Sequence, residues 1–317
     1  MKSKILVVGS INMDVVMTVE KLPARGQTVP GLAMQSFPGG KGANQAVALS
    51  LLGSPVTFLG CVGQDESGHR LINNLRESGV DTSSVHIEAA TPTGTALIAV
   101  EESGENFICV YAGANSKLDQ EKVRKHAELD KVSAVIASLE IPLEPVDLVL
   151  ELAHKRGITT VLNPAPAREL TNRIYQHVDF LIPNETELAQ LSGLKVENLD
   201  DVRLASARLL TRGVKVVVST LGTQGAYYYS ETEQFHVPAV SVQMVDATGA
   251  GDAFVAAFTS KITAGATSRQ AVEFAALVGA LTVTKPGAQN SLPSMEDVED
   301  FAKRREVVDG EDVRIDR

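Results

Sequence analysis

The feature that most constrains the fold of this chain is a regular alternation of short apolar runs and helical segments from residue 119 onward. The apolar runs predict strands, and the amphipathic segments between them predict helices. Near-continuous apolar strands alternating with helices are typical of a mostly parallel sheet with helices on both faces. The predicted strands are 132–139, 158–162, 178–182 and 214–219, and the predicted helices are 119–128, 144–156, 168–176, 184–192, 199–212, 252–264, 268–283 and 294–304.

The first third of the chain adds a different pattern. A short apolar run at residues 5–8 predicts a strand buried on both faces. Polar and apolar residues then mix in a way that predicts half-buried strands and a hairpin around Ser103 and Gly104. We expect one α/β domain over residues 1–317, with a β-rich insert formed by about 13–36 and 94–112. The other predicted elements are strands 15–19, 31–37, 56–62, 94–100 and 106–111, helices 43–52 and 65–78, and a hairpin of 226–229 and 234–237.

The composition excludes several classes of protein. The 317 residues carry 29 Lys+Arg against 39 Asp+Glu, a net charge of −10 that disfavours nucleic acid and anionic membrane as partners. Cys61 and Cys109 lie in apolar runs, so we expect two buried thiols in a reducing compartment. The N-terminus lacks a signal-peptide pattern and no apolar run is long enough to span a bilayer. We therefore expect a cytoplasmic protein.

The glycine-rich stretch at residues 246–252 (DATGAGD) is the strongest candidate for chemistry. It leads into a helix of small and apolar residues, and the first amides of a helix have no intrahelical partner. Gly249 and Gly251 lack the Cβ atoms that would keep an anion away from those amides. A carboxylate beside such a site repels the anion unless it accepts a proton from an attacking nucleophile, which makes Asp252 a candidate base. The alternative interpretation is that Asp252 only caps the helix.

Polar residues follow several predicted strands at the point where each strand ends. Asn12 and Asp14 follow the first strand, Glu140 follows 132–139, and Asn184 and Glu187 follow 178–182. Each has a plain structural explanation, such as a turn, a loop before proline or a helix cap. Ligands of doubly wound sheets bind at the carboxyl ends of the strands, so the coincidence favours one binding site at that edge.

Two long motifs in this chain resemble the two signatures of the ribokinase-like (PfkB) carbohydrate kinases. Residues 39–46 (GGKGANQA) resemble the first signature and residues 246–252 resemble the second, while 9–14 (GSINMD) resembles the start of the sugar site. The likeness covers nearly the whole chain, and no Walker-type G-x-x-x-x-G-K-[ST] is present. The resemblance implies a three-layer α/β/α domain with a mostly parallel central sheet and a small β-sheet lid.

The resemblance also implies phosphorylation of D-ribose at its 5-hydroxyl by ATP, which gives ribose 5-phosphate and ADP. Asp252 would be the general base, and the N–H groups of Gly249, Ala250 and Gly251 would stabilise the transferring phosphoryl group. Asp14 would accept hydrogen bonds from vicinal hydroxyls, Glu140 would reach the anomeric side, and Lys41 would supply positive charge. With Asp252, the expected sugar-binding residues are Asn12, Met13, Asp14, Gly40, Lys41, Gly42, Ala43, Asn44 and Glu140.

The nucleotide and metal sites follow from the same resemblance. Asn184 and Glu187 match an N-x-x-E motif that orders water around Mg²⁺ and the phosphates. Ala276 stands where many relatives place Asn or His against the adenine. The other expected nucleotide-binding residues are Thr220, Leu221, Gly222, Thr223, Gln224, Gly225 and Gly251. A monovalent cation, K⁺, would be held by Asp246, Thr248, Thr282, Lys285, Gly287 and Ser291, of which 286–291 form one loop.

The insert implies a homodimer, because lids of this family often clasp in pairs and an exposed sheet needs its apolar face covered. The residues expected on that face are Val15, Met17, Met34, Phe107 and Val110.

Three other functions remain to be weighed. A kinase of the same family for deoxyribose, fructose or a nucleoside fits the same motifs. An NAD dehydrogenase fits the sheet, but residues 9–12 lack the G-x-G-x-x-G turn after the first strand. A non-catalytic sugar or nucleotide sensor would keep the pocket, but retention of Asp252 with both glycines argues against it.

Overall fold

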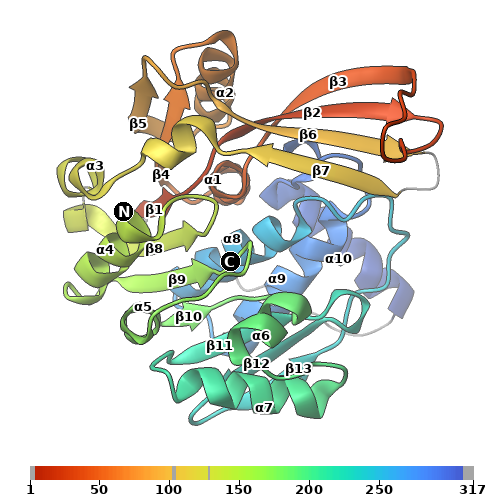
Figure 1. Ribbon diagram of the computed structural model, residues 1–317. Coiled ribbons are helices and arrows are strands. Elements are labelled where there is room, and N and C mark those ends of the chain that lie inside the picture. The colour runs from red at the N-terminus through yellow and green to blue at the C-terminus, as the bar shows by residue number, and fades with distance from the viewer. Residues whose placement is uncertain (1–3, 102–104, 128, 310–317) are drawn as a thin grey trace.

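The structure is a computed structural model, and it describes residues 4–101, 105–127 and 129–309. A nine-stranded sheet forms the body of the molecule, and a four-stranded sheet projects from one end of it (Figure 1). The expected turn at Ser103 and Gly104 and the charged chain end after residue 309 lie outside the described residues.

The large sheet has the strand order β13-β12-β11-β10-β9-β8-β1-β4-β5. Neighbouring strands from β5 to β11 are parallel, and the pairs β11–β12 and β12–β13 are antiparallel. The prediction of a mostly parallel sheet is thus confirmed. Its strands are β1 (Lys4–Val8), β4 (Val56–Gly63), β5 (Asp81–Glu88), β8 (Val132–Ser138), β9 (Thr159–Asn163), β10 (Phe180–Leu181), β11 (Val216–Thr220), β12 (Ala226–Ser230) and β13 (Gln234–Val237).

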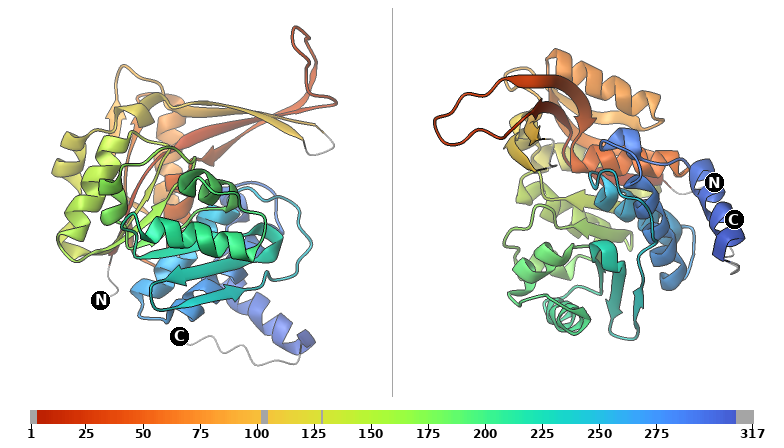
Figure 2. Two further views of the ribbon diagram at one scale, coloured as in Figure 1. Left: turned by 60° about the horizontal axis from the view of Figure 1, so that its bottom comes forward. Right: turned by 90° about the vertical axis from the view of Figure 1, so that its right-hand side faces the viewer.

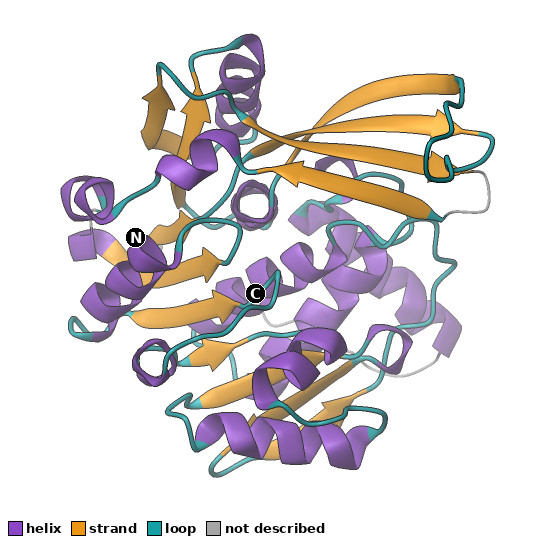
Figure 3. Ribbon diagram, in the orientation of Figure 1, coloured by secondary structure: helices purple, strands orange, loops and turns teal. Residues whose placement is uncertain are grey.

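Helices cover both faces of this sheet, as Figure 3 shows. Side chains of a strand alternate between the faces, so Ile5 and Val7 of β1 belong to one hydrophobic core and Leu6 and Val8 to another. The first core lies against α1, α2, α8, α9 and α10, and the second against α3 to α7. The helices are α1 (Lys41–Leu51), α2 (Glu66–Glu77), α3 (Gln120–His126), α4 (Leu143–His154), α5 (Asn172–Gln176), α6 (Glu185–Ser192), α7 (Leu199–Leu210), α8 (Ala250–Thr263), α9 (Ser268–Thr282) and α10 (Met295–Asp309).

The four-stranded sheet, which we call the lid, has the order β3-β2-β6-β7 and extends away from the body (Figure 2). Its first strand follows the body directly, because β1 ends at Val8 and β2 begins at Asn12. The strands are β2 (Asn12–Val19), β3 (Gly31–Gly39), β6 (Gly94–Glu101) and β7 (Asn106–Tyr111). The lid therefore starts at the carboxyl end of β1, where the sequence predicts a binding site.

Several elements differ from the sequence prediction. Strand β5 was not predicted, because its sequence DTSSVHIE is largely polar; it forms an edge of the sheet, where fewer apolar side chains are needed. Helix α5 has five residues instead of nine because it begins only after Thr171. Strand β10 has two residues, and α10 continues to Asp309, beyond the predicted end at 304.

The expectation of two buried thiols is wrong for one of them. Cys61 is buried in β4, whereas Cys109 is exposed on β7 of the lid. Every residue of β7 is exposed and none belongs to either core, so the apolar run there does not predict burial. Among the described helices, none combines the length and the apolar character that crossing a bilayer requires.

Candidate active site

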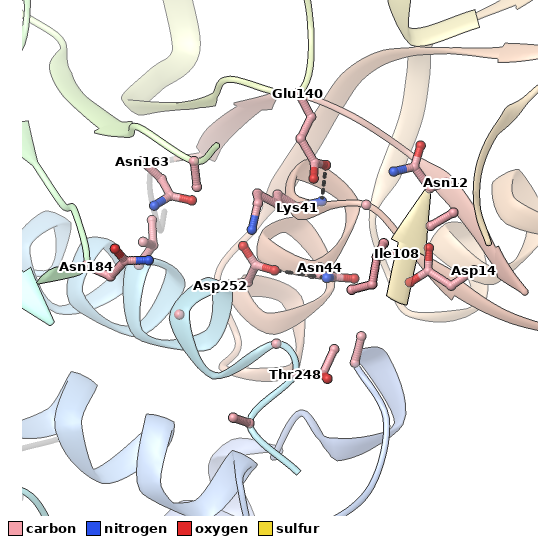
Figure 4. A pocket seen from close by; sticks show the side chains of 18 of the residues that line it. Asn12, Asp14, Lys41, Asn44, Ile108, Glu140, Asn163, Asn184, Thr248 and Asp252 are labelled. Carbon is pink, nitrogen blue, oxygen red and sulfur yellow. Dashed lines mark hydrogen bonds between the residues drawn. The ribbon is translucent and has the colours of Figure 1, made fainter. Parts of the chain in front are cut away.

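A cavity of about 380 Å³ lies between the carboxyl edge of the large sheet and the lid. Figure 4 shows side chains from both sheets and from helices on both sides of it pointing into this space. Most of the predicted sugar and phosphate residues meet there. The predicted residues that line it are Asn12, Asp14, Gly40, Lys41, Asn44, Glu140, Asn184, Glu187, Thr220, Thr248, Gly249, Gly251 and Asp252.

Asp252 lies in the first turn of α8 and is 6% exposed. Each of its carboxylate oxygens accepts one hydrogen bond from an amide of helix α1. The Nδ2 of Asn44 donates to Oδ2 at 2.9 Å, and the Nε2 of Gln45 donates to Oδ1 at 3.0 Å. The carboxylate is therefore held in one orientation by two side chains of the protein itself.

Burial raises the pKa of the Asp252 carboxyl above its ordinary value. The ammonium of Lys41 and the two amides oppose this rise, while the carboxylate of Glu140 adds to it. A carboxylate with a raised pKa is a stronger proton acceptor than an exposed one. The location thus suits a general base, and the simpler view of Asp252 as a helix cap does not explain its two side-chain donors.

The turn before α8 opens onto the cavity. Gly249 is the N-cap with φ of 82°, a left-handed conformation that favours glycine, and a Cβ there would lie 3.1 Å from the carbonyl oxygen of Ala288. At Gly251 a Cβ would meet no heavy atom within 4 Å, so this side of the helix start is free to receive a ligand. The N–H of Ala250 donates instead to the carbonyl of Ala247 at 3.3 Å.

Three polar side chains form the other end of the cavity. Asn12 and Asp14 lie on β2, and Glu140 follows β8. One oxygen of Glu140 accepts from the hydroxyl of Ser10 and from the backbone N–H of Lys41, the latter at 3.1 Å. These bonds tie the carboxylate to the start of α1, and its remaining oxygen is available to a hydroxyl group.

Asp14 has an unusual titration. Burial and the nearby carboxylates of Glu140 and Asp252 raise its pKa to about 7, although Lys41 opposes them. Burial acts to lower the pKa of Lys41, but the surrounding carboxylates raise it on balance. Lys41 is therefore a permanent cation within a ring of four acids, which are Asp252, Glu140, Glu187 and Asp14 in order of their effect.

Asn184 and Glu187 form the capping box of α6. The Oδ1 of Asn184 accepts from the N–H of Glu187, and a carboxylate oxygen of Glu187 accepts from the N–H of Asn184. The plain structural explanation of Asn184 as a helix cap is thus correct, and the residue also lines the cavity beside Thr220. Burial raises the pKa of Glu187. Of the expected nucleotide run, Leu221, Gly222, Thr223, Gln224 and Gly225 do not line the cavity.

The residues expected to hold a monovalent cation lie in the loop 286–291, just before it in the chain, and in the segment 246–248 that bonds to it. Asp246 accepts from the N–H and hydroxyl of Thr248 and, through its other oxygen, from the N–H of Gly287 at 2.8 Å. Although burial opposes it, these hydrogen bonds lower the pKa of Asp246, so its negative charge is retained. Thr282 and Ser291 are buried, and Lys285 is exposed. An ionised carboxylate among carbonyl and hydroxyl oxygens is a hard donor set that suits such a cation.

Three expected sugar residues do not line the cavity. Met13 is 5% exposed and packs in the first hydrophobic core. Gly42 lies against the backbone of Gly9, where an added Cβ would come within 2.7 Å of the Gly9 Cα. Ala43 is fully buried, and its N–H donates to the carbonyl of Ser10 at 2.9 Å. These residues let α1 approach the end of β1 closely. Ala276, which stands at the position expected to face the adenine, packs against the first hydrophobic core.

Sequence reasoning missed three polar residues that support the site. Gln45 and Asn163 share a hydrogen bond of 3.1 Å beneath Asp252. The buried Asn115 donates to Oδ1 of Asn12 at 2.7 Å, so Nδ2 of Asn12 is left to face the cavity. Gln45 lies inside the first motif and Asn163 ends a strand at the same sheet edge, so the sequence could have placed both at the site. Asn115 follows the lid, and no motif or strand end in the sequence indicates that it supports the site.

Comparison with known proteins gives a consistent result. The pfkB family carbohydrate kinase model matches residues 2–295. A ribokinase of Schizosaccharomyces pombe is 40% identical over 93% of this chain and 96% of its own length. A deoxyribokinase of Salmonella typhi is 37% identical, over 95% and 99% respectively. The solved structure of Arabidopsis thaliana ribokinase complexed with ribose and ATP superimposes with a TM-score of 0.88 at 32% identity, covering 96% of this chain and 99% of that one.

Proposed function

This chain belongs to the pfkB family of carbohydrate kinases, and on that basis we propose that it transfers the γ-phosphoryl group of ATP to the 5-hydroxyl of D-ribose. The products are ribose 5-phosphate and ADP. Relatives named ribokinase, one of them solved with ribose and ATP, support this assignment. The observation that carries it is the single cavity in which Asp14 and Glu140 face Asp252 and Gly251.

In the proposed reaction Asp252 accepts the proton of the 5-hydroxyl as that oxygen bonds to the γ-phosphorus. The bond from the γ-phosphorus to the bridging oxygen of ADP breaks in the same displacement, and ADP leaves. The N–H of Gly251 and the positive end of α8 face the charge that develops on the phosphoryl oxygens. The fixed orientation of the Asp252 carboxylate supports this role, since positioning and electrostatics carry most phosphoryl-transfer catalysis.

The sugar is held at the opposite end of the cavity. A carboxylate accepts two hydroxyl donors, so Asp14 suits the vicinal hydroxyls of a ribofuranose and Glu140 suits the anomeric side. Lys41 offsets the charge of the acids around it. Met13, Gly42 and Ala43 contribute by packing α1 against the sugar residues rather than by contact with the sugar.

ATP brings Mg²⁺ into the site, and we assign Asn184 and Glu187 to the water around that ion and the phosphates. Gly222 to Gly225 would lie along the nucleotide outside the cavity. We further propose that K⁺ binds beside the loop 286–291 with Asp246, Thr248, Thr282, Lys285, Gly287 and Ser291. When bound, it would add positive charge behind the turn that holds Gly249.

We infer that the whole chain is one domain whose lid pairs with the lid of a second copy. On the lid face that points away from the cavity, Met34 is 66%, Leu97 56% and Phe107 62% exposed. Val110 does not belong to this face, because it pairs with Ala96 and lines the cavity. The free cysteines and the small-molecule substrates fit an enzyme of the cytoplasm.

The main alternative is a kinase for another sugar, since a relative at 37% identity is named deoxyribokinase. ATP consumption measured with equal concentrations of ribose, 2-deoxyribose, fructose and a nucleoside separates the possibilities. We expect the highest kcat/KM with ribose. A higher value with 2-deoxyribose would overturn the ribose assignment, and no ATP consumption with any acceptor would favour a non-catalytic sensor.

A further inference from the structure

A row of side-chain amides leads from helix α2 to the carboxylate of Asp252. Nδ2 of Asn74 donates to Oε1 of Gln289 at 2.7 Å, and Nε2 of Gln289 donates to Oδ1 of Asn44 at 3.1 Å. Nδ2 of Asn44 then donates to Oδ2 of Asp252 at 2.9 Å, the bond drawn in Figure 4. The three amides come from three separate elements, and neither Asn74 nor Gln289 lines the cavity.

The direction of every bond in this row follows from its carboxylate end. An ionised carboxylate only accepts hydrogen bonds, so Asn44 must turn its NH₂ group toward Asp252. Its oxygen then faces Gln289, which must offer an NH₂ group in turn. The oxygen of Gln289 is left for the NH₂ group of Asn74. Reversal of one amide would place two oxygens or two NH₂ groups against each other, unless the whole row reversed.

Gln289 is held in place by the loop that carries it. Its neighbour Ala288 packs against Gly249, and Gly287 donates its N–H to Asp246. Gln289 also begins the short helical turn η4 (Gln289–Ser291). The same loop thus contacts the turn before α8 and, through Gln289, the side chain of Asn44 that donates to Asp252.

We propose that Gln289 and Asn74 are positioning residues that keep the NH₂ group of Asn44 directed at the catalytic base. This inference rests on the proposed role of Asp252. Gln289 and Asn74 contact neither the sugar nor the nucleotide in this assignment; they act through Asn44. The second donor, Gln45, reaches the other oxygen of Asp252 independently.

Reversal of the row has a definite electrostatic consequence. With Oδ1 of Asn44 facing Asp252, the carboxylate loses one donor and gains a repulsive dipole, so its charged form is less stable and its pKa rises. The other charged groups around Asp252 are Lys41 on α1, Glu140 after β8, Asp14 on β2 and Glu187 on α6. None of them belongs to the row, so the change reports on the amides.

Two substitutions on different elements oppose the present direction of the row without removing a side chain. In Gln289→Glu both neighbours of the Asn44 amide are carboxylates that only accept, so residue 289 competes with Asp252 for the NH₂ group of Asn44. In Asn74→Asp the carboxylate attracts the NH₂ group of Gln289, and the oxygen of Gln289 then competes with Asp252 for the NH₂ group of Asn44. The matched controls are the adjacent, exposed Asn290→Asp and Asn73→Asp, which add the same charge in the same loop and helix outside the row.

The measurement is the pH dependence of kcat and of kcat/KM for the sugar. We expect the acidic limb to move upward by roughly 1–2 pH units in both row variants, as loss of one hydrogen bond to a charged group predicts. On the acidic limb, kcat at a given pH should fall by the matching factor of about ten- to a hundredfold. The KM for ATP should stay unchanged. In the two control variants the acidic limb of kcat and of kcat/KM should lie at the same pH as in the wild type.

The inference is overturned if both row variants titrate like their controls. Should Gln289→Glu fail to fold, Asn74→Asp on α2 decides the result alone. Asp252→Asn tests the role of Asp252 as the base separately from the role of the amide row. If that variant keeps its turnover, the base assignment itself fails; if it is inactive while the row variants match their controls, only the role of the amide row is rejected.

Discussion

Asn44 and Asp252 are 208 positions apart in the chain and are joined by a hydrogen bond of 2.9 Å between Nδ2 and Oδ2. The bond links the two motifs of the sequence at one point, because Asn44 lies in the first and Asp252 in the second. It also fixes the carboxylate that faces the cavity. In the proposed reaction this carboxylate is the group that accepts the proton.

Replacement of Asp252 by Asn should remove nearly all turnover. The amide has the same shape but accepts no proton, and loss of a general base costs about 10²–10⁴ in rate. Ribose and ATP should still bind, which calorimetry of the variant can measure. A kcat within a few-fold of the wild type would exclude Asp252 as the base.

Ribose affinity should rise as the pH increases through 7. The pKa of Asp14 is raised to about 7, so below this pH the carboxyl is protonated and offers fewer acceptor sites to the sugar hydroxyls. The KM for ribose should therefore fall between pH 6 and pH 8, while the KM for ATP changes little. In Asp14→Asn this pH dependence should disappear and the KM should be high throughout.

The same carboxyl should make the protein less stable at higher pH. A raised pKa means that, between its ordinary value of 3.8 and about 7, the folded state binds more protons at Asp14 than the unfolded state does. Its stabilising effect is complete below 3.8 and is lost as the pH rises through 7. Thermal unfolding should show Asp14→Asn gaining stability relative to wild type from pH 5 to pH 8; a constant difference would contradict the raised pKa.

Gly249 and Gly251 should respond differently to alanine. Gly249→Ala places a Cβ in a left-handed conformation 3.1 Å from the oxygen of Ala288 and should cost at least about 1–2 kcal/mol of unfolding free energy. Gly251→Ala adds a methyl group in open space within a helix, so the midpoint of unfolding should hold or rise. Its kcat should nevertheless fall, since the methyl group enters the space proposed for the phosphoryl group. Equal midpoints for the two variants would contradict this contrast.

Activity should be higher in K⁺ than in Na⁺ at equal ionic strength. The proposed cation lies behind the turn of Gly249, where it would hold the amides toward the phosphoryl group. Asp246→Ala removes the negative charge of that site and should abolish the difference between the two salts. Identical wild-type rates in KCl and NaCl would dismiss the cation.

The lid should hold two copies together. Sedimentation at micromolar concentration should give a dimer for the wild type and a monomer for Leu97→Lys, which places a charge on the outer lid face. Leu204→Lys is the matched control, because Leu204 is 50% exposed on α7, away from the lid. A wild-type monomer, or a control that also dissociates, would refute the lid interface.

The body of the fold could be predicted because each buried strand carries its own apolar run. Strand β5 escaped prediction because, as an edge strand, it buries few side chains and its sequence is largely polar. Cys109 was expected to be buried since its run is apolar, but every residue of β7 in the structure is exposed. A single sequence reports how apolar a strand is, and it does not report whether another layer covers it.

The site was predictable where chemistry requires particular residue types at fixed spacing. Asp14, Asp252 and Glu140 follow strands or glycine turns, and the cavity gathers them together. Met13 and Ala43 lie in the same motifs but support the site from beneath, because adjacent residues of a strand or helix point in different directions. Asn115 and Gln289 become meaningful only once their partners far along the chain are known.

The direct passage from β1 into β2 has a consequence for how substrate enters and leaves. Asn12 and Asp14 belong to the lid itself, whereas Glu140 follows a strand of the body, so the residues proposed to bind the sugar are divided between the two sheets. Any displacement of the lid from the body would therefore also separate the two halves of the proposed sugar site. Release of the sugar would then be coupled to that displacement.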